Sequence, residues 1–252
     1  MIDTIPFDIV FEASPPFDGR TVELTLEMAS DDGLEETTDM FDCLCTLAQL
    51  GIFDANSARD ERPAAAWASE AQVRRSVWRR ALTFGHIDIS FWRVLLQMAT
   101  QCHYHLAPID RLFVRDLSPR GAFVSAGNVL NAPYLPLPRH LPFRLVRAED
   151  AVRDLIAIRA TAVSPVGDDT FATMKKVFED WGSLVYVGAF ASADAAIDDY
   201  QIDRVEVRRL DLTLVECAAF NWNAPWEAIN YAIRLCLGLH RHVVPIAEVE
   251  VE

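Results

Sequence analysis

Glycine is scarce in this chain, at 10 residues among 252, and no glycine-rich phosphate-binding loop is present. The patterns GxSxG and HExxH, which mark common serine hydrolases and zinc proteases, are absent as well. These absences argue against the commonest nucleotide-dependent and hydrolytic enzymes. We therefore favour a protein that is not an enzyme and that needs no cofactor or metal.

Basic residues are also few: 23 Lys and Arg against 37 Asp and Glu give a formal net charge of −14. A nucleic-acid binder needs a basic surface, so no nucleic-acid partner is expected. No apolar run approaches the roughly 18 residues of a membrane span, and the acidic N-terminal region does not resemble a secretion signal. Five cysteines without a framework spacing indicate free thiols. These features predict a soluble cytoplasmic protein with no membrane partner.

Acidic charge is concentrated near the start, where residues 1–60 hold 14 acidic and 2 basic residues. Two interpretations stay open: a solvated helix start whose acids complement the helix dipole, or a docking face for a basic partner. Basic residues that follow, at 74, 75, 79 and 80, are expected to neutralise part of this charge. The densest run comprises Asp31, Asp32, Glu35, Glu36, Asp39 and Asp42.

An internal similarity organises the rest of the chain. Residues 103–109 read HYHLAPI and residues 240–246 read HRHVVPI, and both fit the pattern His-x-His-aliphatic-x-Pro-Ile. Each follows a helical pattern that begins near a tryptophan and precedes an alternating strand pattern, at 109–117 and at 246–252. The shared order indicates a duplication.

Each half reads as strand, helix, strand, strand, helix, strand. In the second half we predict a strand at 155–164, a helix that ends at Gly182, and strands at 184–190 and within 203–217. This order resembles the ferredoxin-like fold, an α+β architecture with helices on one face of an antiparallel sheet. We expect two such βαββαβ halves, over 1–120 and 151–252. The Pro- and Gly-rich segment 121–150 joins them and is expected to run extended.

Histidine and tryptophan provide the candidate site residues. The histidine pairs fit either a metal or ligand site in a cleft between the halves, or ordinary helix ends. The helix-end interpretation is favoured, because side chains two residues apart on a helix diverge by about 200°. Trp222, between two asparagines, marks either a recognition loop or a buried strand end, while Trp92, Trp181 and Trp226 are expected in the core. A His86–Asp88 base and orienter is disfavoured. The histidines of the pairs are His103, His105, His240 and His242.

Two functions from different classes follow from these features. The first is a cytoplasmic binding protein, in concrete form an acidic inhibitor or immunity-type protein that neutralises a basic partner such as a toxin. The alternative is an enzyme or small-ligand or metal-binding protein with its site in a cleft between the duplicated halves. A third class is a structural subunit that oligomerises through a sheet edge.

Overall fold

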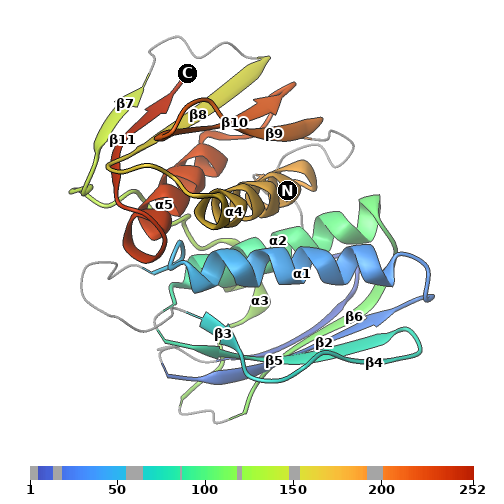
Figure 1. Ribbon diagram of the computed structural model, residues 1–252. Helices are drawn as coiled ribbons and strands as arrows, with labels where there is room; N and C mark the ends of the chain where they lie inside the picture. Colours follow the sequence, from blue (N-terminus) through green and yellow to red (C-terminus); the bar gives the residue numbers. More distant parts are fainter. Residues whose placement is uncertain are drawn as a thin grey trace. The chain divides into compact units, whose positions relative to one another are not determined.

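Two compact units make up the described chain. The structure, a computed structural model, describes residues 5–13, 19–54, 65–85, 87–117, 121–147, 154–191 and 201–252. Within this part, the first unit extends to Leu135 and the second begins at Pro136. Each unit holds one β-sheet, and the two sheets with five helices confirm the expected α+β class (Figure 1). None of the described helices is long and apolar enough to span a membrane.

The sheet of the first unit has the strand order β1-β6-β2-β5-β3, and β4 also pairs with β5. The pairing of β1 with β6 is parallel and the others are antiparallel. Figure 1 shows α1 and α2 on one face of this sheet. The elements are β1 Asp8–Glu12, β2 Thr21–Met28, α1 Leu34–Gln49, β3 Ala65–Trp67, β4 Gln72–Arg74, β5 Val77–Phe84, α2 Ile89–His105, β6 Ile109–Asp116 and α3 Ala126–Leu130.

The sheet of the second unit has the strand order β7-β11-β8-β10-β9. Here the pairing of β7 with β11 is parallel and the others are antiparallel. Helices α4 and α5 lie on one face of this sheet (Figure 1). The elements are β7 Arg144–Arg147, β8 Leu155–Ala162, α4 Asp168–Tyr186, β9 Arg204–Arg209, β10 Leu214–Phe220, α5 Trp226–His242 and β11 Ile246–Val251.

Alternation along the central strands separates a buried face from a charged face. In β2, Val22, Leu24 and Leu26 are almost completely buried, whereas Glu23 and Glu27, which point to the opposite face, are partly exposed. This period of two is what a strand with one face on the core requires. The central strands were therefore predicted near their observed positions, and their core faces follow directly from the sequence.

Two predictions for the second unit are wrong. Gly182 does not end α4, which continues to Tyr186, and residues 184–190 form the last helical turn and the turns after it instead of a strand. A Cβ on Gly182 would lie 2.5 Å from Cγ2 of Val205, so the glycine lets β9 pack directly against the helix. The two strands between α4 and α5 are β9 and β10, and both follow residue 190 in the sequence.

The segment between the repeated patterns is partly structured. It contains the short helix α3 and the edge strand β7. Ser125 caps the start of α3, where its side chain accepts a hydrogen bond from the backbone N–H of Asn128. The run of prolines between them has no helix or strand, as expected from the donors they lack. An arginine fastens this run on each side: Arg93 donates to the carbonyl oxygen of Ala132, and Arg234 donates to that of Pro136 at 2.8 Å.

Candidate functional site

The acidic run lies on the loop before α1 and on the solvent-facing side of that helix. Its core-facing side is apolar, with Phe41 and Leu44 completely buried. We call the five exposed acids of this run the acidic strip. None of them forms an ion pair with another residue that the structure describes. The acidic strip consists of Asp31, Asp32, Glu35, Glu36 and Asp39.

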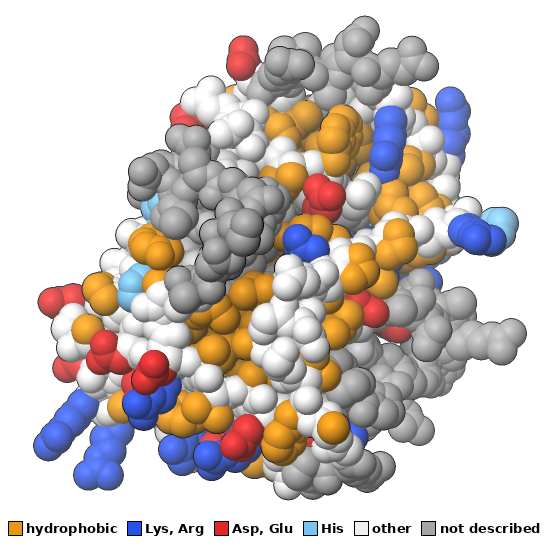
Figure 2. Space-filling model, turned by 180° about the vertical axis from the view of Figure 1, so that it is seen from behind, with side chains coloured by type: hydrophobic (Ala, Val, Ile, Leu, Met, Phe, Trp, Pro, Cys, Tyr) orange, Lys and Arg blue, Asp and Glu red, His pale blue; other side chains and the backbone are white. Residues whose placement is uncertain are grey.

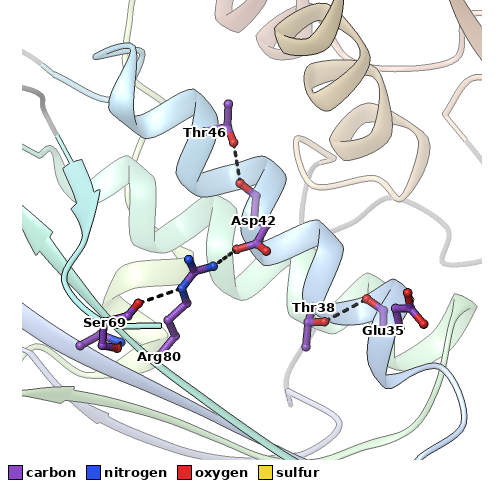
Figure 3. Close-up of polar contacts among 7 residues, drawn as sticks. Glu35, Thr38, Asp42, Thr46, Ser69 and Arg80 are labelled. Carbon is purple, nitrogen blue, oxygen red and sulfur yellow. Dashed lines mark hydrogen bonds and ion pairs between the residues drawn. The ribbon is translucent and has the colours of Figure 1, made fainter. Parts of the chain in front are cut away.

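Asp42 belongs to the same acidic run but is neutralised. Its carboxylate lies 2.6 Å from Nη1 of Arg80, which comes from β5, and Figure 3 shows the two side chains pointing toward each other. The guanidinium also donates to the carbonyl oxygen of Ser69 at 3.1 Å and stacks over Trp67 at 4.0 Å from the ring centre. Among the arginines expected to offset the run, only Arg80 forms an ion pair with one of its described residues.

Many acids elsewhere on the described surface are paired with arginine or lysine. On the open face of the first sheet, Arg115 lies 3.3 Å from Glu12. On the second sheet, Arg159 contacts three glutamates of the neighbouring strands, with its Nε 2.8 Å from Glu216. Such cross-strand pairs balance the charge of an open sheet face. Against this background the acidic strip is a region of uncompensated negative charge.

His103 and His240 hold the turn between a helix and the next strand in their own units. Nδ1 of His103 accepts the backbone N–H of Ile109 at 3.0 Å, and Nδ1 of His240 accepts that of Ile246 at 2.9 Å. The same Nδ1 atoms lie 3.1 Å from the carbonyl oxygen of Ile109 and 3.0 Å from that of Ile246. The pattern of histidine and isoleucine therefore has the same structural role in both units.

The second histidine of each pair takes a different position. Nε2 of His105 lies 3.2 Å from Oε1 of Gln101, and His242 is exposed at the end of α5. No group of three or more potential ligands suited to a metal ion occurs among the described residues. His103 and His105 belong to the first unit, and His240 and His242 belong to the second.

The tryptophans divide into buried and exposed members. Trp92 and Trp181 are fully buried, as predicted, but Trp226 is 53% exposed because it is the first residue of α5, ahead of the buried stretch that begins at Ala228. Trp222 is half-buried and stacks on Trp181 with ring centres 6.0 Å apart. Trp222 thus follows the end of β10 and packs against α4 through Trp181.

The side chain of Asp88 caps α2 by accepting the N–H of Ser90 at 2.8 Å. This bond gives Asp88 a structural role at the helix start. His86, the other member of the disfavoured pair, lies outside the described residues.

All five cysteines are free, and four of them are buried. Burial raises the pKa of Cys102 and of Cys236 to about 12, and it also raises the pKa of Cys45 and of Cys217. A thiol with a raised pKa is a poor nucleophile. These four residues act as small apolar members of the core.

A pocket of about 670 Å³ in the first unit was not predicted. It brings together His103, the start of β6 and the residues around β1, which are distant in the sequence. Arg111 lies within it, 3.3 Å from Asp8 and 3.7 Å from Glu27, so the charges there are largely satisfied. No sequence motif marks this pocket, because it depends on the parallel pairing of β1 with β6.

Comparison with known proteins assigns no family. No protein-family model matches the chain, and no curated protein matches it. Similar solved structures include a conserved protein from Enterococcus faecalis V583, with 8% identity over 92% of this chain and 77% of that one, and a TM-score of 0.21. A protease from Helicobacter pylori has 9% identity over 89% and 75%, with a TM-score of 0.19. A protein described as a predicted insulinase family protease from Yersinia pestis has 13% identity over 92% and 69%, with a TM-score of 0.18. Likenesses this weak carry no conclusion about function.

Proposed function

We propose that the protein works in the cytoplasm by binding a basic protein through the acidic strip. In concrete form it would be an acidic inhibitor or immunity-type protein that neutralises a cationic partner such as a toxin. The observation that supports this proposal is the uncompensated charge of five exposed carboxylates on one loop and one helix face. Unpaired charge of one sign attracts a partner of the opposite sign and raises the association rate.

The helix dipole offers a simpler reason for part of the strip. Glu35 and Glu36 lie in the first turn of α1, where negative charge is favourable. The effect is confined to the first turn, however, and Asp39 lies beyond it. The extent of the strip along the helix therefore favours a role in binding.

The test is a capture experiment with the full chain and with two variants of equal charge. The strip variant carries Asp31→Asn, Asp32→Asn, Glu35→Gln and Glu36→Gln. The control variant removes four exposed or half-exposed acids elsewhere, Glu70→Gln, Asp110→Asn, Asp169→Asn and Glu227→Gln. We expect the wild type and the control to retain one basic protein from a lysate of the source cell at low salt, and the strip variant to lose it. Equal retention by all three proteins would refute the role of the strip.

We also infer that the two units are tandem copies of a ferredoxin-like unit. Several features support this proposal: the equivalent strand orders, the additional parallel edge strand in each sheet, and the His103–Ile109 and His240–Ile246 bonds. An experimental structure of each half, in which the halves superimpose over their sheets and helices, would test it. Different strand orders in the two halves would contradict it.

A further inference from the structure

An unpaired basic turn occurs in the same unit as the acidic strip. The turn between β4 and β5 carries Arg74 and Arg75, both exposed, and neither forms an ion pair with another described residue. Arg75 has a φ of 53°, a left-handed conformation that two-residue hairpin turns usually give to glycine or asparagine. An arginine is therefore held at the tip of this hairpin despite an unfavourable backbone conformation.

The basic turn and the beginning of the acidic strip lie at the same end of the first unit. The backbone N–H of Met28 donates to the carbonyl oxygen of Ser76 in the turn at 2.9 Å, and Asp31 and Asp32 follow shortly after Met28. Figure 1 shows the loop after β2 and the β4–β5 turn at this end of the sheet. Figure 2 shows Lys and Arg side chains projecting at the lower left of that view, with Asp and Glu side chains near them. Charges of both signs are thus presented together.

The neighbouring strand edge is open as well. In the described sheet β4 pairs with β5 alone, and its central residue, Val73, is 62% exposed. Short edge strands with charged side chains normally resist pairing with another chain. That protection does not hold against a surface of opposite charge, which attracts the same arginines.

We propose that this end of the first unit is a self-complementary face through which two copies of the chain associate. Two adjacent patches of opposite sign on one face meet twice across a twofold axis, which gives a closed dimer. Arg74 and Arg75 of each copy would face Asp31 and Asp32 of the other, with Val73 between them. This inference does not depend on the proposed function, although a dimer would compete with a basic partner for the strip.

Charge reversal tests the proposal in the full chain by analytical ultracentrifugation. At about 0.02 M salt the average mass of the wild type is expected to rise with protein concentration, and at about 0.5 M salt it should fall to that of a monomer, because salt screens exposed charges. Arg74→Glu with Arg75→Glu should weaken association roughly tenfold or more, and so should Asp31→Arg with Asp32→Arg. A chain that carries all four changes should associate again, because its two patches are exchanged.

The control variant reverses two exposed basic residues of the second unit, Arg139→Glu and Arg147→Glu, and should associate like the wild type. Circular dichroism verifies that every variant is folded. A wild type that remains monomeric at low salt over the whole concentration range overturns the proposal. So does association that survives either reversal, or that the four changes together do not restore. The capture experiment above is separate, because it reports on a different protein.

Discussion

His103 and His240 each fix a chain reversal through one ring nitrogen. The bond from Nδ1 to the N–H of an isoleucine six residues later occupies the nitrogen that would otherwise be open to a metal. The sequence pattern located both residues at helix ends, as the prolines that follow them required. The hydrogen bond itself was not predictable, because it depends on how tightly the chain turns from helix into strand.

The two histidines of one pair should therefore differ in their effect on stability. His240→Ala leaves the N–H of Ile246 without its acceptor and should lower the free energy of unfolding by about 1–2 kcal/mol. His242→Ala, at an exposed position of the same helix, should change it by less than about 0.5 kcal/mol. Urea unfolding of both variants provides the comparison. Equal losses would contradict the structural role of His240.

The buried thiols predict a loss of stability in alkali. The pKa of Cys102 and of Cys236 is raised to about 12 in the folded chain, whereas unfolded thiols ionise near their ordinary value. Because only the unfolded state loses these protons, the stabilisation is complete below that ordinary value and falls as pH rises toward 12. Each thiol should contribute up to about 1.4 kcal/mol per pH unit. The urea midpoint between pH 8 and pH 10.5 measures this slope, and Cys236→Ala should make it shallower. A slope unchanged by that substitution would count against the thiol as its cause.

At the scale of the elements, α1 and α4 show which features of a helix its sequence pattern predicts and which it does not. In α1, apolar residues recur at helical spacing, among them Phe41 and Leu44, and Gly51 follows the end of the helix, so the sequence pattern marks this element. The apolar run at 184–190, which includes the end of α4, suggested a strand, because a short apolar run has no period that separates strand from helix. The helix continues past Gly182, where it packs against Val205 of β9, and a contact between residues so far apart lies outside any local pattern. The sequence likewise indicated that basic residues at 74, 75, 79 and 80 would offset the acidic run, but it did not indicate that Asp42 would be the acid that pairs with Arg80.

The packing of β9 on α4 can be tested at Gly182. Gly182→Ala places a methyl group 2.5 Å from a Val205 methyl and should destabilise the chain by about 1–3 kcal/mol, although alanine favours a helix. Gly127→Ala in α3, where a Cβ meets open space, should be neutral or slightly stabilising. Chemical unfolding measures both effects. Adding Val205→Ala to Gly182→Ala should recover part of the loss, and no recovery would point to another cause.

For the whole molecule, the fastening of the segment between the units has a direct consequence. Arg93 also lies over the ring of Tyr134, 3.6 Å from its centre, so residues 132–136 are held by two arginines, one in each unit. A Pro-rich segment without these bonds would be open to proteases.

Removing either fastening arginine should expose this segment. Arg93→Ala and Arg234→Ala should each accelerate cleavage near residues 132–136 several-fold in limited proteolysis, because the backbone loses a hydrogen-bond donor and becomes accessible. Arg139→Ala, an exposed arginine in the same segment, is the matched control and should leave the rate unchanged. Cleavage that begins elsewhere in all variants would show that the arginines do not protect this segment.

The parallel edge strands also govern the order in which the chain can fold. Asp8 of β1 contacts Arg111 of β6, which is synthesised 103 residues later. In the second unit, β7 likewise pairs with β11, which comes much later in the sequence. During synthesis, each sheet therefore exposes an unfinished border until its last strand leaves the ribosome. Contacts so distant in sequence slow folding and leave strand edges available to other chains meanwhile. Strand β11 thus completes the second sheet, and a nascent protein stalled before it would leave the paired edges of β7 and β8 exposed.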